Sequence, residues 1–175
     1  MRFADSIAET VGKTEVEYGL DIALKSFRHI CRQYVPFGSR VIFIGNGGSS
    51  AIASHMAIDW TKNGGIRAIA FNDAPTLTCL GNDFGYENVF SKQLEYYSTP
   101  KDVVVIISSS GKSPNILNAA DEALKLGLYL VTFTGKQPDN ELRKKGHMNF
   151  YVPHEDYGVV EIAHLILLHS VVSDN

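Results

Sequence analysis

Short apolar runs rich in β-branched residues alternate, from residue 41 onward, with longer segments that carry the period of an amphipathic helix. This alternation is typical of βαβ units, in which helices join and cover parallel strands. Such a sheet is buried on both faces, so its strands are apolar throughout. The runs occupy residues 41–44, 68–71, 103–107, 128–133 and 149–152. We therefore predict an α/β fold, a three-layer α/β/α sandwich around a five-stranded parallel sheet.

Helical periods extend this prediction along the chain. Helices are expected at about 15–34, 50–62, 86–97, 114–126, 138–145 and 159–172. A chain of 175 residues suits one compact domain, and no repeat, low-complexity tract or linker marks a second. We predict a single domain over residues 1–175, with an N-terminal helix at about 15–34 and an α/β core from about 40 to 175.

The composition of the chain excludes some classes of binding partner. The net charge is −3 and no run of Lys or Arg occurs, whereas binding a phosphate backbone needs a concentrated positive face. We therefore expect no direct nucleic-acid binding. No apolar stretch approaches a membrane span and the first residues lack a secretory pattern, so we expect no membrane association and a cytoplasmic protein. Cys31 and Cys79 form no CxxC or Cys/His cluster and are interpreted as small buried residues.

A glycine-rich loop follows the first strand and leads directly into a helix. Its sequence at 45–50 is Gly-Asn-Gly-Gly-Ser-Ser. Glycines let the backbone approach a ligand, and the free N–H groups at the start of the helix favour an anion. The dinucleotide fingerprint fails because Ser50 stands where its third glycine belongs, so no nicotinamide or flavin cofactor is expected. An ordinary glycine-rich turn without a ligand remains the alternative.

A serine-rich loop follows the third strand and again opens a helix. Its sequence at 108–115 is Ser-Ser-Ser-Gly-Lys-Ser-Pro-Asn. Serine hydroxyls and the N–H groups of a helix start donate to a phosphate monoester without selecting a nucleotide base. Ile106 stands where a Walker A sequence begins with glycine, so ATP is not implied. Helix capping and turn formation by the serines remain the alternative.

The loops at 45–50, 82–87 and 108–115, taken in order and spacing, resemble the signature loops of the SIS family. The resemblance is greatest to the phosphoheptose isomerases and extends from about residue 41 to 169. It implies a flavodoxin-like fold, a phosphosugar held by the serine-rich loop, and active sites near the subunit interfaces of a homotetramer. It also implies a set of substrate contacts: Asn46, Gly47, Gly48, Ser49, Asp59, Asn82, Asp83, Ser108, Ser109, Ser110, Ser113 and Glu161.

Two groups of polar side chains on helices are candidate metal ligands. His55 and Asp59 are four residues apart, so they share one helix face, although such a pair is more often a surface hydrogen bond. Glu161, His164 and His169 lie in the apolar last helix and need partners there. Spacing alone favours Glu161 with His164, three residues on, whereas the resemblance favours His169.

The resemblance implies one Zn²⁺ per subunit, held by His55, Asp59, Glu161 and His169, with Asp59 and His169 catalytic. This chain departs from the family pattern in several places. Asp59 is one methylene shorter than the usual Glu, and Glu161 replaces a neutral Gln. Ser50 and Asn63 stand where His and Arg are usual. The chemistry is thus expected to be retained in an altered pocket.

The implied activity is aldose–ketose isomerisation of a phosphorylated sugar, foremost sedoheptulose 7-phosphate to D-glycero-D-manno-heptose 7-phosphate, through a metal-stabilised enediolate. Such a reaction needs a base beside the carbonyl, a group that manages the proton on oxygen, and stabilisation of the enediolate. The alternative is a non-catalytic SIS protein that oligomerises or binds a partner, of the kind associated with replication initiators. Retention of His55, Asp59 and His169 favours the enzyme, because a scaffold has no need of these residues.

Overall fold

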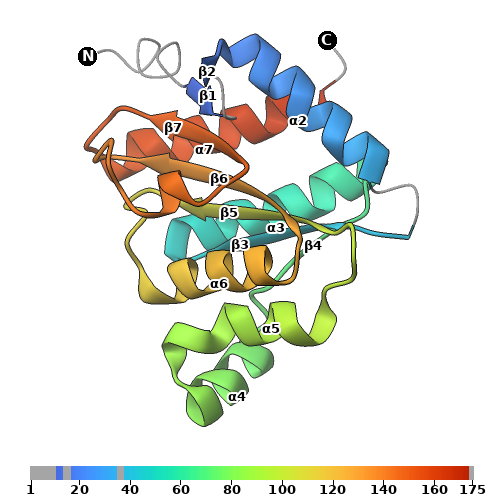
Figure 1. Ribbon diagram of the computed structural model, residues 1–175, viewed down its shortest axis with the longest axis vertical. Helices are drawn as coiled ribbons and strands as arrows, with labels where there is room; N and C mark the ends of the chain where they lie inside the picture. The colour runs from blue at the N-terminus through green and yellow to red at the C-terminus, as the bar shows by residue number, and fades with distance from the viewer. Residues whose placement is uncertain (1–10, 14–16, 35–37, 174–175) are drawn as a thin grey trace.

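The computed structural model describes residues 11–13, 17–34 and 38–173, and they form one mixed sheet with helices on both faces (Figure 1). The strand order is β2-β1-β7-β6-β5-β3-β4. The strands are β1 (Val11–Lys13), β2 (Glu17–Tyr18), β3 (Val41–Gly45), β4 (Ala68–Ala70), β5 (Val103–Ser108), β6 (Tyr129–Gly135) and β7 (Met148–Val152). The predicted five strands, β3 to β7, are parallel. Their order follows the flavodoxin-like pattern 2-1-3-4-5, which reverses between β3 and β5.

Six helices of the described residues form the two outer layers of the sandwich. They are α2 (Leu20–Tyr34), α3 (Gly47–Lys62), α4 (Ala74–Phe84), α5 (Val89–Tyr97), α6 (Pro114–Lys125) and α7 (Tyr157–Val172). Helices α2, α3 and α7 cover one face of the sheet, and α5 and α6 cover the other, with α4 projecting beyond α5 (Figure 1). Within the described residues, no helix is long and apolar enough to cross a membrane.

Alternate residues of each central strand enter separate hydrophobic cores. In β3, Val41 and Phe43 pack under α2, α3 and α7, whereas Ile42 and Ile44 pack under α4, α5 and α6. All four side chains are buried, as expected of a sheet covered on both faces. Trp60 of α3 anchors the first core, with its ring edge-on to Phe43 and its indole N–H donating to a backbone carbonyl of α7.

Two helix predictions differ from the structure. The first helix begins at Leu20 instead of about residue 15, because 17–18 form strand β2 and Gly19 separates it from α2; residues 15–16 lie outside the described residues. The helix expected at 138–145 is reduced to a 3₁₀ turn, η3 (Leu142–Lys144). There the buried Asn140 side chain donates to the carbonyls of Gly135 and Gln137 and accepts from the Arg143 N–H, so local side-chain bonds compete with helical ones.

Helix α4 and the antiparallel strands β1 and β2 were not predicted from sequence. Only Leu80 of α4 is buried, so the helix carries too short an apolar period to be recognised. Its start does carry a capping signal, since Asp73 accepts a hydrogen bond from the Thr76 N–H and Pro75 lies in the first turn. The two short strands extend the sheet beyond β7.

A buried carboxylate joins the starts of β3 and β5. Asp102 is fully buried and accepts hydrogen bonds of 2.8 Å from the backbone N–H groups of both Arg40 and Thr99. We predict that Asp102→Ala lowers the free energy of unfolding by about 2–4 kcal/mol, because two N–H donors lose their acceptor. The exposed ion pair of Asp121 with Lys145 provides a control, and Asp121→Ala should cost less than about 1 kcal/mol. Denaturant unfolding measures both, and equal effects would contradict the prediction.

Candidate active site

A small cavity lies at the carboxyl ends of β3 and β5, where the strand order reverses. Open α/β sheets place their ligands at this topological switch point. The cavity has a volume of about 120 Å³. Its lining combines hydroxyl, amide and carboxylate side chains with one apolar residue: Asn46, Ser49, Ile107, Ser108, Ser109, Ser110, Ser113, Tyr157 and Glu161. The four serines that the sequence singled out in the second loop thus surround one space.

Local hydrogen bonds fix the path of the serine-rich loop. The Ser108 hydroxyl accepts a hydrogen bond from the N–H of Gly111, 3.2 Å away. Gly111 has a φ of +62°, and the side chain of Asn140 fills the space where a Cβ would stand. Any other residue at 111 would therefore meet both backbone strain and a clash. The loop then enters α6 through Pro114 in its first turn.

A reciprocal pair of amides joins the two loops across the switch point. Asn46 and Asn115 each donate one side-chain hydrogen bond to the other, both of 2.9 Å. The Tyr86 hydroxyl lies 3.4 Å from the Asn46 side-chain oxygen that accepts from Asn115. Asn115 and Tyr86 were missed as site residues, although Asn115 stands inside the quoted loop and directly follows the proline. The pair holds the glycine-rich and serine-rich loops in a fixed relation.

One hydroxyl of the serine loop lacks a partner. The Oγ of Ser109 is buried and, within the described part of the chain, has no hydrogen-bond acceptor or donor. The backbone of the same residue is held, because its carbonyl accepts from the Gly135 N–H at 3.1 Å. Leaving a buried hydroxyl unpaired is unfavourable, so the residue is suited to a ligand that brings acceptor oxygens.

The carboxylate of Glu161 lies against the start of α3. A Cβ placed on Gly48 would stand 2.5 Å from both carboxylate oxygens, so only glycine admits this approach. Position 48 is in the first turn of α3, where the helix dipole favours negative charge. The anion that the glycine-rich loop predicted is, in this structure, a side chain of the protein itself.

A second polar cluster joins α3 and α7. The Nδ1 of His169 lies 3.2 Å from one oxygen of Asp59, and the side-chain amide of Asn63 donates to the other oxygen at 2.5 Å. The ring of His55 lies edge-on to that of His169, with centroids 5.4 Å apart. Asp59 is 15% exposed and His169 is 42% exposed, so the pair is open to solvent. Both oxygens of the Asp59 carboxylate are therefore positioned.

The two clusters do not meet within one chain. Asp59 follows Gly47 by twelve residues along α3, about 18 Å at the helical rise, and His169 follows Glu161 by eight residues along α7, about 12 Å. The expectation that Asp59 and His169 lie beside the serine loop is thus not met in the single subunit. The cavity stands at the first turns of both helices and the Asp59–His169 pair near their last turns.

The four expected zinc ligands are likewise divided. Among the described residues, no three His, Cys, Asp or Glu side chains converge on a point that could hold a metal ion. His55, Asp59 and His169 are neighbours and have the donor types that zinc prefers. Glu161 lies instead against Gly48, and eight residues of α7 separate it from His169. The donor chemistry fits zinc, but one chain does not present a formed site.

His164 lies in the core and not in either cluster. It is fully buried, with Nε2 3.1 Å from the Thr134 carbonyl oxygen and its ring edge-on to Phe133. Its Nδ1 has no partner among the described residues. Burial lowers the pKa of His164 to about 4, despite the opposing hydrogen bond to Thr134. The structure therefore separates His164 from Glu161, against the pairing that spacing alone favoured.

Other expected residues lie elsewhere. Asn82 and Asp83 are exposed at the end of α4, hydrogen-bonded to each other at 2.9 Å, and neither lines the cavity. Tyr157 lines the cavity, and only its place at the start of α7 could have indicated this from the sequence. Cys31 is buried as expected, which raises the pKa of its thiol, whereas Cys79 is exposed, contrary to expectation.

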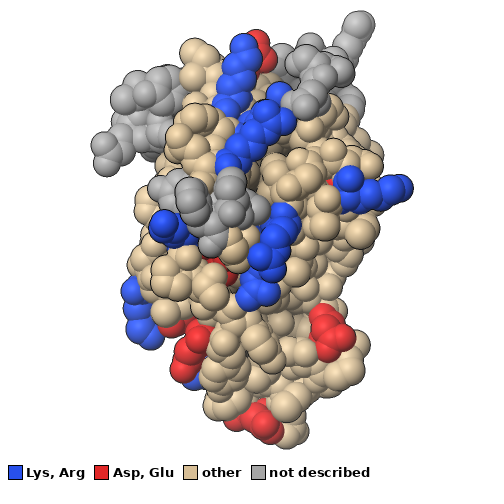
Figure 2. Space-filling view, turned by 90° about the vertical axis from the view of Figure 1, so that its right-hand side faces the viewer, with Lys and Arg blue, Asp and Glu red and all other residues tan. Residues whose placement is uncertain are grey.

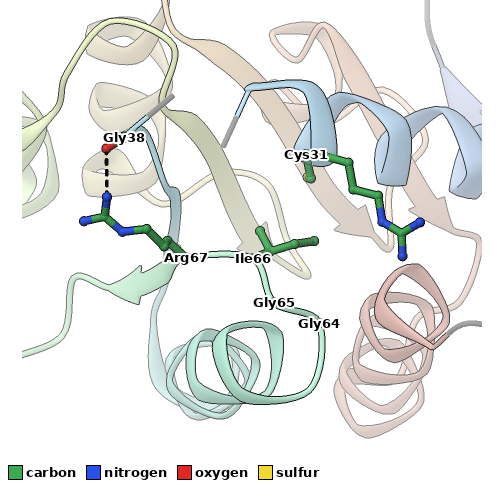
Figure 3. Close-up of a pocket in the computed structure, with 7 residues that line it drawn as sticks. Cys31, Gly38, Gly64, Gly65, Ile66 and Arg67 are labelled. Carbon is green, nitrogen blue, oxygen red and sulfur yellow. Dashed lines mark hydrogen bonds between the residues drawn. The ribbon is translucent and has the colours of Figure 1, made fainter. Parts of the chain in front are cut away.

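A larger cavity of about 510 Å³ opens at the amino ends of β3 and β4. Figure 3 shows it between the end of α2, with Cys31, and the turn that carries Gly64, Gly65 and Ile66. The Arg67 guanidinium donates to the Gly38 carbonyl there at 3.1 Å. Lys and Arg side chains gather across the upper part of the side of the molecule shown in Figure 2. None of the three signature loops contributes to this cavity.

The fold and the small cavity define an open, flavodoxin-like α/β domain with a serine-lined cavity at its switch point. The family model of the SIS domain matches residues 2–135, more than half of the chain, and this protein belongs to that family. The matched segment contains all three signature loops and ends with β6.

Similarity to individual proteins extends over most of the chain. Phosphoheptose isomerase of Burkholderia pseudomallei is 38% identical over 147 residues, which cover 81% of this chain and 74% of that protein. Phosphoheptose isomerase of Helicobacter pylori is 32% identical over 157 residues, covering 86% and 81%. The structure of phosphoheptose isomerase from Neisseria gonorrhoeae aligns with a TM-score of 0.81 at 30% identity, covering 97% of this chain and 93% of that one.

The buried His164 should make folding sensitive to acid. Its pKa is about 4 in the folded protein and about 6.5 when unfolded, so the unfolded state takes up a proton first as the pH falls. We predict that its contribution is present above pH 6.5 and that about 3 kcal/mol is lost between pH 6.5 and 4. Denaturant unfolding at pH 7.5 and 4.5 should show a smaller pH difference in His164→Gln than in the unchanged protein. The exposed His29 gives the control His29→Gln, and an unaltered difference in His164→Gln would refute the prediction.

Proposed function

We propose that this protein is an aldose–ketose isomerase of a phosphorylated sugar, converting sedoheptulose 7-phosphate to D-glycero-D-manno-heptose 7-phosphate. The observation that carries the proposal is the cavity lined by four serines at the switch point of a chain that matches phosphoheptose isomerases over most of its length. Hydroxyl groups suit a phosphate monoester. Two free thiols and a fold without a membrane-spanning helix in its described residues support action in the cytoplasm.

The reaction moves a proton between two neighbouring carbons while a carbonyl and a hydroxyl exchange places. In our proposal the Asp59 carboxylate removes the proton from the carbon beside the carbonyl and returns it to the other carbon. His169, 3.2 Å from Asp59, transfers the proton between the two sugar oxygens. Asn63 and His169 each hold one Asp59 oxygen, which keeps the base oriented. Binding of the distal phosphate fixes the reacting carbons in place.

We further propose that Zn²⁺ is held by His55, Asp59 and His169, with Glu161 completing the set as the resemblance implies. The two imidazoles and the carboxylate next to each other on α3 and α7 support this proposal. When bound, zinc polarises the carbonyl and stabilises negative charge on oxygen. Because one chain leaves Glu161 apart from the other three, its participation requires a change from the arrangement of the single subunit.

The separation of the two clusters supports a homotetramer whose active sites combine chains. In one subunit a single sugar phosphate cannot reach both the serine cavity and Asp59, which lies ten residues beyond the lining residue Ser49, about 15 Å along α3. The outer faces of α3 and α7 expose large apolar side chains beside the Asp59–His169 pair, with Ile58 at 59%, Ile162 at 52% and Ile166 at 37%. Such faces are typical of subunit contacts. We propose that they bring the pair of one chain to the cavity of another.

Substitutions in the pair test the catalytic assignment. We predict that Asp59→Asn and His169→Ala each reduce turnover of sedoheptulose 7-phosphate by about 10²-fold or more, because each removes a proton-transfer group. Product formation followed by NMR, with and without a chelator, measures this, and metal analysis of the same samples shows whether zinc is lost. His29→Ala, at an exposed position of α2, is the control. Full activity in Asp59→Asn would remove this residue as the base, and absence of turnover and of phosphosugar binding in the unchanged protein would favour the scaffold alternative.

The assembly has its own test. We predict a particle of about four times the 19.3 kDa chain in light scattering at micromolar concentration. Ile162→Asp with Ile166→Asp should produce smaller species, because charge is introduced into an apolar contact. Ile22→Asp, on α2 at 54% exposure, is the matched control and should leave the assembly intact. A monomer in the unchanged protein would overturn the proposed combination of chains.

A further inference from the structure

Lys136 holds an unusual position next to the cavity. It directly follows β6 and has a φ of +57°, a left-handed conformation that residues other than glycine rarely adopt. Its backbone is held on both sides, since its N–H donates to the His154 carbonyl at 3.2 Å and its carbonyl accepts from the Tyr151 hydroxyl at 2.7 Å. Backbone conformations of this kind occur where the surroundings determine them, often at functional sites.

The side chain of Lys136 ends on a residue of the cavity. Its Nζ lies 3.5 Å from the centroid of the Tyr157 ring, a cation–π contact, and Lys136 as a whole is half-buried. Tyr157 lines the serine cavity, and Glu161, one helical turn later, lines it too. The residue before Lys136, Gly135, bonds the backbone of Ser109. The ammonium group thus lies on the ring of a residue that lines the cavity, although Lys136 is not itself a lining residue.

The cavity lacks a cation of its own. Among its described lining residues, the only one that ordinarily carries charge is Glu161, which is negative. A phosphate monoester carries nearly two negative charges near neutral pH, so its entry beside Glu161 is unfavourable without a positive partner. An ammonium group that approaches the phosphate removes this imbalance and adds charge-assisted hydrogen bonds.

We propose that Lys136 is a substrate-binding residue whose Nζ leaves the Tyr157 ring and pairs with the phosphate in the serine cavity. In the absence of ligand the Tyr157 ring holds the ammonium group. The ammonium group leaves the ring at little cost, because an exposed cation–π contact is weaker than an ion pair with a phosphate. This inference rests on the proposed function for the identity of the sugar, whereas the contact with the phosphate group does not depend on it. Lys112, exposed within the serine loop, is the competing cation.

Inorganic phosphate is the probe, because it tests the phosphate contact without the reaction. Isothermal calorimetry should show that Lys136→Met weakens phosphate binding about tenfold or more, the loss expected from one charge-assisted contact. Lys136→Arg should restore most of the affinity. Lys144→Met, at an exposed position of η3, removes the same charge elsewhere and should leave affinity unchanged. Thermal unfolding of each variant shows whether the fold is retained.

NMR supplies a readout that a structural lysine would not change. In the free protein the Lys136 ε-methylene protons should be shifted upfield by the Tyr157 ring, and saturating phosphate should remove this shift. Phosphate binding that is unaffected by Lys136→Met, or an upfield shift that persists at saturation, would overturn the proposal, as would a loss confined to Lys112→Met. Failure of isomerase activity with these phosphate results intact would count against the proposed reaction and leave the Lys136 contact standing.

Discussion

Burial of both faces of the parallel sheet is the constraint on which the rest of this structure depends. Because alternate side chains of β3 and β5 enter two separate cores, neither strand has a face left for polar chemistry. Polar side chains of these two strands and their loops can therefore gather only where the strands end. The carboxyl ends of β3 and β5 diverge into helices on opposite faces of the sheet, and the space between them is the serine-lined cavity.

The same architecture explains the division of the polar residues. Helices α3 and α7 both start at the cavity and run side by side, as shown by the bond from Trp60 to the Leu168 carbonyl. Residues early in the two helices meet near the cavity, as Gly48 and Glu161 do, whereas Asp59 and His169 meet about three turns later in α3 and two turns later in α7. A straight helix cannot bring both groups to one point. Function as an isomerase consequently depends on a second copy of the chain, in our proposal.

Sequence patterns predicted the parallel strands and the serine loop closely, because these features depend on local composition. The five strands are continuous apolar runs, and Ser108 to Ser113 follow one of them directly. What sequence could not show depends on distant contacts. Helix α4 has one buried residue and hence no clear period, and the short turn at η3 is joined to the serine loop, where the Leu142 N–H donates to the Gly111 carbonyl. Spacing favoured His164 as a partner of Glu161, but His164 lies on the face of α7 that packs in the core.

Charge at the starts of α3 and α6 supports the phosphate site that we propose. Both α3 and α6 begin at the switch point, and both dipoles favour an anion. At α3 this demand is met by the Glu161 carboxylate, which lies against Gly48. A phosphate placed there would meet like charge, so the start of α6, with its serines, is the better site. Glu161 also raises the need for a cation near the cavity, and in our proposal Lys136, on the ring of Tyr157 one helical turn before Glu161, supplies it. The carboxylate of Glu161 thus disfavours a phosphate at the start of α3 and calls for a cation beside the serines.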